Sequence, residues 1–344
     1  MAISTGPTRR RVPKLATLSL REQWSQAVIG QEQFIEAVEP YLARAAVGLA
    51  PEGRPAGIFL LGGPTGSGKT WAVKALAKVL HGTIKHLVQI NCGEFQLDHE
   101  IAKITSSPPG YLGHRETPPL ITQQKLAAVT SARSSLSIVL FDEVEKGSAG
   151  LQRLLLGILE EGTLRLGDCT VVNFEHTLIF MTTNLAADKI KAQALPPMGF
   201  AGGAERRIDP GVGRLTAAVM GQSRKEFAPE FMGRVDAVIG FRALTEEDAR
   251  QIAGLELAAL RQRVLDKIGL DLVYSELPDL VQRVVEKGWD PTNGARGIRR
   301  AVENEVATPL ARRLGDEAVL VGNRASVRVA PEGVEFEFEM GAGG

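Results

Sequence analysis

The chain has 344 residues, of which 44% are hydrophobic and 23% charged, an ordinary globular composition with room for two compact domains. Its 40 basic and 40 acidic residues cancel, so no overall field would draw it to nucleic acid or to an anionic membrane. No apolar run approaches the roughly 20 residues needed to span a bilayer. The basic run Arg9–Arg11 is not followed by an apolar segment, so the N-terminus is not typical of a secretory signal.

Five short apolar runs predict buried β-strands, because they do not alternate with polar residues and are bounded by polar or turn residues. Between two of them, the apolar positions of Leu151–Leu159 form one continuous helical stripe. Strands that alternate with helices imply an α/β fold with a five-stranded parallel sheet covered on both faces. The predicted strands are Gly57–Leu61, Leu87–Asn91, Ser137–Phe141, Thr177–Thr182 and Val235–Phe241.

Two segments interrupt this alternation. Within Leu164–Phe174, Gly167 and Asp168 separate two short extended pieces, which predicts an inserted hairpin. Leu195–Gly221 is rich in Pro, Gly and Arg and has no clean period, so we expect a long loop there. Long loops within compact domains are usually functional or disordered.

The pattern changes to mainly helical after about Phe241. Thr245 followed by three acidic residues is a good helix start, because the acids face the positive end of the helix dipole. Helical patterns follow in Leu277–Val285 and Ile298–Leu310, and alternating stretches between Ser326 and Phe338 predict a closing hairpin. We therefore predict a flexible N-terminal tail (1–20), a large α/β domain (21–242) and a smaller, mainly helical C-terminal domain (243–344).

A phosphate-binding loop is predicted at residues 63–70, where Gly-Pro-Thr-Gly-Ser-Gly-Lys-Thr follows a strand and precedes a helical pattern. The glycines let successive N–H groups point into one concavity, and the helix dipole adds positive potential. Lys69 would place its charge on the outer phosphates, and the Thr70 hydroxyl suits Mg²⁺. The cofactors expected are thus ATP and Mg²⁺, and the nucleotide-binding residues predicted here are Pro64, Thr65, Gly66, Ser67, Gly68, Lys69 and Thr70.

Besides a phosphate-binding loop, hydrolysis needs a metal-binding acid and a base, and two acids at the end of a buried strand supply both. Carboxylates at this end of a parallel strand project into the crevice where ligands of such sheets bind. Asp142 is placed to hold Mg²⁺ and contributes to nucleotide binding, while Glu143 can polarise the attacking water as general base. The sequence therefore predicts an ATPase rather than a protein that only binds phosphate.

These motifs resemble the AAA+ module of the Clp ATPases, most closely the second ATPase ring of the ClpA, ClpB and ClpC type. The resemblance covers roughly Val28–Leu314 and implies an AAA+ P-loop NTPase core followed by a smaller lid domain of the Clp D2-small type. Its motifs occur in family order. They are Val28-Ile29-Gly30-Gln31, the phosphate loop, Pro108–Gly113, Asp142–Lys146, Met181–Asn184, Pro229–Arg234 and Gly294–Arg296.

The resemblance implies a role for residues outside the phosphate loop. Val28 and Ile29 would line the adenine pocket, as two apolar residues before a helix could. Asn184 would be the sensor that hydrogen-bonds the γ-phosphate or the attacking water, and Arg296 the second sensor on the lid domain. Arg234 resembles the arginine finger that reaches the ATP of a neighbouring subunit. Because such a finger requires assembly, we expect a homo-oligomer, by resemblance a hexameric ring.

Tyr111, together with Leu112, resembles the substrate-gripping loop of Clp rings. The neighbouring glycines allow the loop to move, and an aromatic side chain with few rotors can press on any extended polypeptide. The resemblance therefore implies a protein unfoldase or remodelling chaperone that threads protein substrates through a ring pore. The hairpin near Gly167 would be a second contact, and a tyrosine buried in a turn is the alternative for Tyr111.

The sequence also departs from the family pattern. Two prolines stiffen His114–Pro119 after the pore tyrosine, and Ala228 replaces an arginine common in relatives. Met198–Phe200 falls where protease-linked relatives dock on the ClpP peptidase, although a loop packed on its own domain fits as well. About 27 residues precede Val28, so we expect the tail, an adaptor or another partner protein to recruit substrates. The sequence does not decide whether a ClpP-like peptidase is a partner.

Two other functions compete with the unfoldase. One is an ATP-switched assembly or remodelling factor that acts on one dedicated partner without full threading. The other is a nucleic-acid motor or loader, which the zero net charge and the lack of a recognisable nucleic-acid module disfavour. Cys92 and Cys169 form no metal-spaced pair, which suits a reducing compartment, so we expect a cytoplasmic protein. From the zero net charge and the lack of a long apolar run, we expect no nucleic-acid partner and no membrane partner.

Overall fold

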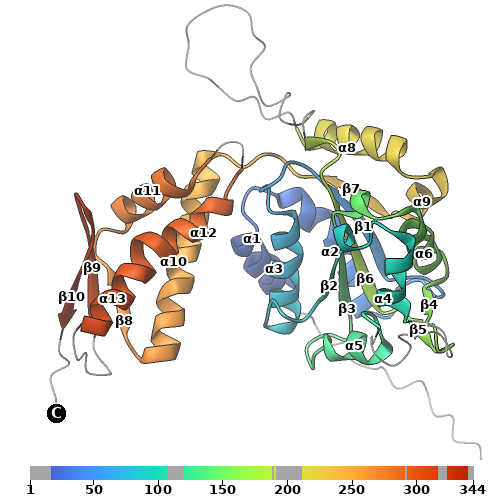
Figure 1. The fold of residues 1–344 in the computed structure, drawn as a ribbon, viewed down its shortest axis with the longest axis horizontal. Helices are drawn as coiled ribbons and strands as arrows, with labels where there is room; N and C mark the ends of the chain where they lie inside the picture. The colour runs from blue at the N-terminus through green and yellow to red at the C-terminus, as the bar shows by residue number, and fades with distance from the viewer. Residues whose placement is uncertain are drawn as a thin grey trace, which may run out of the picture.

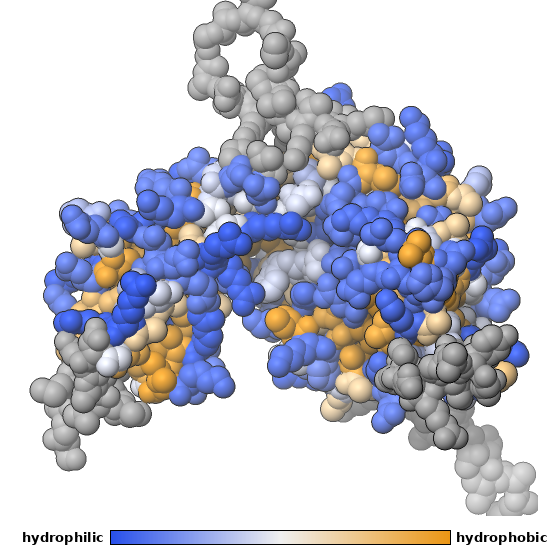
Figure 2. Space-filling model, viewed as in Figure 1, coloured by the Kyte–Doolittle hydropathy of each residue, from blue (hydrophilic) through white to orange (hydrophobic). Residues whose placement is uncertain are grey.

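The computed structural model of the protein describes residues 17–106, 119–187, 190, 211–290, 293–316 and 324–339. These residues form two lobes, a large one built on a five-stranded sheet and a small one of helices with a three-stranded sheet (Figure 1). On the face shown in Figure 2, a notch separates the lobes and hydrophilic side chains cover most of both. In the described part of the chain, no helix combines the length and the apolar character that crossing a bilayer would require.

The central sheet confirms the five predicted strands and their parallel arrangement. Its spatial order is β2-β3-β6-β1-β7, and every neighbouring pair is parallel. The strand β6 therefore lies between the strand that leads into the phosphate loop and the strand that ends in the acid pair. The bounds are β1 Gly57–Gly62, β2 Val88–Asn91, β3 Ser137–Asp142, β6 Thr177–Thr183 and β7 Ala237–Gly240.

Alternate residues of the central strands are buried in two separate cores. Along β1, Phe59 and Leu61 pack with α1, α2 and α3, whereas Ile58 and Leu60 pack with α6 and α9 on the opposite face. Because both faces are covered, the strand has no polar alternation, as expected for a buried parallel strand. The helices are α1 Thr17–Ala27, α2 Glu32–Ala46, α3 Lys69–His81, α4 Ala102–Thr105, α5 Gln123–Ala128, α6 Ala149–Glu161 and α9 Pro229–Arg234.

Helix α1 corrects one part of the predicted tail. It begins at Thr17, so the last residues of the segment predicted as flexible are helical. The cause is tertiary packing, since Leu20 lies against the core and Trp24 is buried against Phe34, with ring centroids 5.3 Å apart. An amphipathic helix docked in this way is stabilised by burial more than by intrinsic propensity.

Helix α8 corrects the predicted long loop. Val212–Glu226 is helical, although the sequence led us to expect a loop as far as Gly221. Leu215 and Val219, one turn apart, are buried against the ends of β1 and β7. The approach is close, because a Cβ at Gly240 would lie 2.5 Å from the Leu215 backbone. Contact with the sheet therefore outweighs the weak helical pattern, and the rest of the predicted loop, residues 195–210, lies outside the described residues.

The inserted hairpin is confirmed on the α6 side of the sheet. The strands β4 (Thr163–Arg165) and β5 (Val171–Asn173) pair antiparallel, and the turn between them is closed by a bond from Cys169 N to Leu166 O at 3.0 Å. Leu164 and Val172 are buried in the same core as α6. The hairpin is therefore anchored to the large lobe by one apolar face.

The small lobe is mainly helical, as predicted, but it contains one strand that the sequence did not reveal. β8 (Asp271–Tyr274) pairs parallel to β9 (Arg324–Ala330), which pairs antiparallel to β10 (Gly333–Glu339) as the predicted hairpin. The three strands and four helices enclose one core. The helices are α10 Glu246–Ile268, α11 Leu277–Gly288, α12 Arg296–Val302 and α13 Thr308–Asp316, with a π-helical turn at Glu303–Ala307 between the last two.

A charged cluster fixes the junction between the lobes. Both terminal nitrogens of Arg242 donate to the Asp248 carboxylate, at 2.5 and 2.9 Å. The Thr245 N–H also donates to Asp248 at 2.7 Å, and Thr245 Oγ1 accepts from Asp248 N, which completes the capping box of α10. Burial opposes ionisation of Asp248, but the hydrogen bonds from Arg242 and Thr245 outweigh it and hold the pKa of Asp248 below its usual value. The predicted start of the lid helix is thus confirmed, while the exact domain boundary stays a prediction.

Candidate functional site

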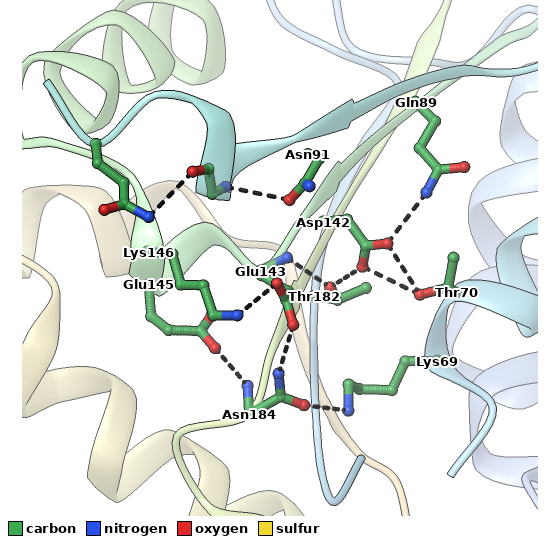
Figure 3. Close-up of polar contacts among 12 residues, drawn as sticks. Lys69, Thr70, Gln89, Asn91, Asp142, Glu143, Glu145, Lys146, Thr182 and Asn184 are labelled. Atoms are coloured by element: carbon green, nitrogen blue, oxygen red, sulfur yellow. Dashed lines mark hydrogen bonds and ion pairs between the residues drawn. The ribbon is translucent and has the colours of Figure 1, made fainter. Parts of the chain in front are cut away.

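Three strand ends meet at one edge of the central sheet. Because β6 lies between β1 and β3, Thr183 pairs with Gly62 and Met181 pairs with Phe141. The phosphate loop, the acid pair and Asn184 lie at or directly after these strand ends. Figure 3 shows the side chains of Lys69 and Asn184 turned toward each other, and the Asp142 carboxylate directed toward Thr70 and Thr182. The strand order therefore assembles predicted site residues that lie far apart in the sequence.

The backbone of the phosphate loop requires glycine, as Gly68 and Gly66 illustrate. Gly68, which immediately precedes α3, has a φ of +92°, a left-handed backbone conformation that residues with a side chain rarely adopt. Gly66 has φ +79°, and a Cβ there would lie 2.0 Å from the Asn293 carbonyl oxygen of the small lobe. One glycine is thus required by backbone curvature and the other also by close contact with the second lobe. Pro64 and Thr65 precede Gly66 in the loop.

The loop has polar groups suited to an anion. Ser67 is buried, and its hydroxyl has no hydrogen-bond partner among the described residues. An unpaired buried hydroxyl is costly unless a ligand or water satisfies it. The N-terminus of α3 adjoins this loop, and helix N-termini attract phosphates. The residues present therefore fit a polyphosphate.

Lys69 is held over the loop by three acceptors. Its Nζ donates to the carbonyl oxygens of Gly63 at 2.8 Å and Pro64 at 2.9 Å, and to Asn184 Oδ1 at 2.9 Å. Burial lowers the pKa of Lys69 to about 8, although the nearby carboxylates of Glu145 and Asp142 oppose this shift. The cation is consequently desolvated and lacks full charge compensation, which makes it a receptor for phosphate oxygens.

Asp142 and Thr70 form an oxygen pair at the rim of the loop. Thr70 Oγ1 lies 3.0 and 3.2 Å from the two carboxylate oxygens of Asp142. Gln89 Nε2 donates to Asp142 at 3.1 Å, and Thr182 Oγ1 makes a further short hydrogen bond to it. A hydroxyl and a carboxylate fit Mg²⁺, which prefers oxygen ligands and takes most of its other ligands from water and phosphate.

Glu143 occupies a strained position between two other side chains. Its φ of 58° places a non-glycine residue in the left-handed region, which persists only where the surroundings enforce it. Glu143 N donates to Thr182 Oγ1 at 2.9 Å, and its carboxylate accepts from Lys146 Nζ at 2.7 Å and from Asn184 Nδ2 at 3.4 Å. This hydrogen bond to Glu143 raises the pKa of Lys146. The carboxylate is thus directed toward the strand ends, as a general base requires.

Asn184 connects the phosphate side of the site to the acid side. Its carbonyl oxygen accepts from Lys69 while its amide nitrogen donates to Glu143, and its backbone N–H donates to Glu145 Oε1 at 3.0 Å. One carboxamide therefore contacts both the phosphate-loop cation and the candidate base (Figure 3).

A cavity of about 560 Å³ extends from the phosphate loop into the space between the lobes. Val28 and Ile29 line it from the large lobe, and Ile252 and Leu255 line it from α10 of the small lobe. Beyond the polar loop, these apolar side chains share the wall with Glu256, Arg296 and Arg299 of the small lobe, so the cavity offers both charged and apolar contacts, which suit a nucleoside polyphosphate.

Gln31 joins the loop to the junction of the lobes, a role that the sequence did not reveal. The side chain is 1% exposed, and its Nε2 donates to the carbonyl oxygens of Ser67 and Arg242, each at 3.0 Å. Its Oε1 accepts from Gln33 Nε2 at 2.8 Å and from Arg242 N at 3.2 Å. All four hydrogen-bonding positions of the carboxamide are thus used.

The two predicted arginines lie in different places. Arg296 lines the cavity at the start of α12, close enough to be one of the charges that lower the pKa of Lys69. Arg234 does not line the cavity of its own chain, because it ends α9 and forms an ion pair with Glu160 at the end of α6. Of the other predicted residues, Tyr111 and Leu112 and the candidate docking tripeptide Met198–Phe200 lie outside the described residues.

Sequence reasoning missed several residues that line or support the site. Gln89 and Thr182 contact Asp142, and Lys146 contacts Glu143. Their positions at strand ends, or directly after the acid pair, were the available signal. Trp71 follows the phosphate-loop threonine and lines the cavity, and a large aromatic residue at a predicted ligand site could have been noticed.

Sequence profiles of two domain families match the chain in succession. The profile of the AAA domain (Cdc48 subfamily) matches residues 54–238, which is more than half of the chain. The profile of the C-terminal, D2-small domain of ClpB protein matches residues 244–327. The first match contains the phosphate loop and the acid pair, and the second contains Arg296.

Similar full-length proteins are Clp chaperones. The chaperone protein ClpB of Dichelobacter nodosus is 34% identical over 324 residues, which are 93% of this chain and 34% of that protein. ClpB of Rhodopseudomonas palustris is 36% identical over 90% of the chain and 33% of its own length. The chloroplastic ClpC3 of Oryza sativa subsp. japonica is 35% identical over 83% of the chain and 29% of its own length. The chain therefore spans about a third of the length of the curated relatives it matches.

A solved structure has the same fold over nearly the whole chain. The closed-state cryo-EM reconstruction of Hsp104 with ATPγS and FITC casein superposes with a TM-score of 0.75 at 25% identity, and covers 95% of this chain and 53% of that one. With the two domain profiles in the same order, these likenesses show that the chain belongs to the AAA+ ATPases of the Clp family and joins an AAA domain to a ClpB-type D2-small domain.

Proposed function

We propose that this protein hydrolyses ATP between its two lobes and uses the energy to unfold protein substrates by threading them through a ring. The observation that carries the proposal is the Asn184 carboxamide, which hydrogen-bonds both Lys69 and Glu143. A site that only bound phosphate would need the cation alone. Here one side chain holds the cation close to a carboxylate that can act as a base, and hydrolysis uses both groups.

The chemistry of the site follows from the direction of these groups. Backbone N–H groups of the loop and Lys69 would bind the phosphates, and Arg296 would add charge from the small lobe. Thr70 and Asp142 would hold Mg²⁺, which offsets charge on the phosphate oxygens when bound. Glu143 would accept the proton of the attacking water, while Val28 and Ile29 would contact adenine.

The proposal extends to the assembly of the protein, to how it grips its substrates and to its compartment. Arg234 does not line the cavity of its own chain and is nearly half exposed, which supports a finger that completes the site of a neighbouring copy in a homo-oligomer, by family resemblance a hexamer. Tyr111 and Leu112 would grip the substrate, and an adaptor or a ClpP-like peptidase would be an additional partner. Cys92 and Cys169 are free thiols, which supports a reducing compartment such as the cytoplasm.

Replacing the candidate base tests hydrolysis. Glu143→Gln keeps the side-chain shape but removes the proton acceptor, so we expect kcat for phosphate release to fall about 10²–10⁴-fold. ATP affinity measured by calorimetry should stay close to that of the unaltered protein. Glu226→Gln on the exposed part of α8 serves as the matched control and should turn over normally. Undiminished phosphate release by Glu143→Gln would remove the base from the mechanism.

The low pKa of Lys69 predicts how ATP affinity depends on pH. The cation binds phosphate, and bound phosphate stabilises the cation, so ATP binding should raise the pKa of Lys69 above about 8. Above pH 8, binding must therefore take up a proton, and Kd should rise by up to about tenfold per pH unit. Calorimetry at pH 8.5 in buffers of different ionisation enthalpy would count this proton. A Kd that is constant from pH 7 to 9.5 would contradict the prediction.

Mixing two inactive variants tests the arginine finger. Arg234→Ala alone should lower kcat by about 10³–10⁵-fold, because the transferring phosphoryl group loses its guanidinium. Arg234→Lys should also be impaired, since an ammonium group lacks the planar fork. Glu143→Gln subunits retain the finger, so mixed assemblies should restore turnover at the intact sites of Arg234→Ala subunits. A mixture no more active than its components would show that Arg234 does not act between subunits.

Tyr111→Ala tests threading separately from hydrolysis. The variant should retain ATP turnover but fail to unfold a stably folded, tagged protein, because the proposed grip is lost. Tyr111→Phe preserves the aromatic ring and should retain most unfolding. The readout is the loss of native fluorescence of the tagged protein. Full unfolding by Tyr111→Ala would instead favour a remodelling factor that acts without this grip.

A further inference from the structure

Trp71 is an exposed aromatic residue at a position where exposure is costly. It lies in the first turn of α3, one residue after Thr70, and 43% of its surface is exposed. The other tryptophans differ, since Trp24 is 2% exposed and Trp289 packs against the core of the small lobe. An indole left in water forgoes the stabilisation that burial would give. Its exposed ring is therefore available to a ligand at the rim of the phosphate loop.

The indole is held in one place by its polar edge. Trp71 Nε1 donates to the Ala27 carbonyl oxygen at 2.9 Å. Ala27 immediately precedes Val28 and Ile29, the predicted adenine contacts, whereas Thr70 belongs to the phosphate site. The side chain therefore extends from the phosphate loop toward the apolar end of the same cavity, which Trp71 lines.

Leu255 contributes a second exposed apolar side chain to the wall of this cavity. It lies on α10 of the small lobe and is 41% exposed. Trp71 comes from the large lobe, so each lobe offers an apolar surface to the same space. A flat ligand with one apolar face toward each would remove both from water.

We propose that Trp71 is a nucleotide-binding residue whose indole covers the nucleoside part of ATP, with Leu255 contributing from the other lobe. The inference rests on the proposed function and adds a base- and sugar-contacting residue to it. Aromatic side chains bind nucleobases by stacking, because every base has a flat π-face. The hydrogen bond to Ala27 orients the ring before the ligand arrives, which reduces the entropy lost on binding.

A fluorescence titration tests whether Trp71 contacts the nucleoside. ATP and ADP, each with Mg²⁺, should change the tryptophan emission of the full chain, whereas inorganic tripolyphosphate should not. Trp71→Phe should abolish the change, and the control Trp289→Phe should retain it. An ATP-induced change that survives in Trp71→Phe would overturn the inference.

A binding comparison tests whether the contact contributes affinity. Trp71→Ala should raise the calorimetric Kd for ATP about tenfold or more, the usual effect of removing a stacked aromatic residue, and Trp71→Phe less. The Kd for tripolyphosphate should be unchanged in both. Equal ATP affinity in Trp71→Ala, or an equal loss of tripolyphosphate affinity, would overturn the inference and leave the proposed ATPase intact. An unaltered protein that binds no ATP would overturn both.

Discussion

The arrangement of the site depends on the buried carboxamide of Gln31. It donates to the backbone of Ser67 in the phosphate loop and exchanges hydrogen bonds with both backbone groups of Arg242 at the junction of the lobes. Gln33 completes the set and itself donates to Gly240 on β7 at 2.9 Å. A buried polar group left unpaired costs about 1–3 kcal/mol, so the loop and the junction cannot move independently without breaking hydrogen bonds of Gln31. Gly30 reinforces this coupling, because a Cβ there would lie 2.4 Å from the Arg242 guanidinium.

This connection gives a physical basis for coupling ATP to the position of the lobes. A ligand shifts a conformational equilibrium only by contacts that differ between the two conformations. The phosphate loop belongs to the large lobe, whereas Arg296 and Leu255 reach the cavity from the small one. The loop also touches the small lobe directly, where Gly66 packs against Asn293. If ATP binds as proposed, a change in charge at its terminal phosphate would act on groups of both lobes, and the carboxamide of Asn184 would connect that change to Glu143.

The sequence predicted the elements whose stabilising contacts are local or periodic. The continuous apolar strands, the capping box at Thr245 and the glycine-rich loop carry their own signals, and the structure has all of them. Prediction from the sequence failed where a contact with a distant element decides the conformation. Val212–Glu226 is helical because Leu215 and Val219 are buried on the sheet, and β8 exists because a later strand pairs with it. The role of Gln31 was hidden for the same reason, since its partners come from segments up to 211 residues away. The strand order, which places Asn184 between Lys69 and Glu143, is likewise a property of the fold and not of any one motif.

The ion pair of Arg234 with Glu160 bears on how subunits would communicate. Both side chains are close to half exposed, and exposed ion pairs contribute only about 0.2–1 kcal/mol. The ion pair therefore orients the Arg234 guanidinium but is weak enough to break when a stronger partner is near. A triphosphate bound between two copies would offer more negative charge than one carboxylate, and several acceptors that suit the planar fork of a guanidinium. The finger would consequently leave Glu160 when a neighbour holds ATP and return when the phosphate has gone. Glu160 lies in the last turn of α6, whose apolar side packs in the same core as β3, so release of the finger would change the forces on the helix that packs against the strand carrying the acid pair.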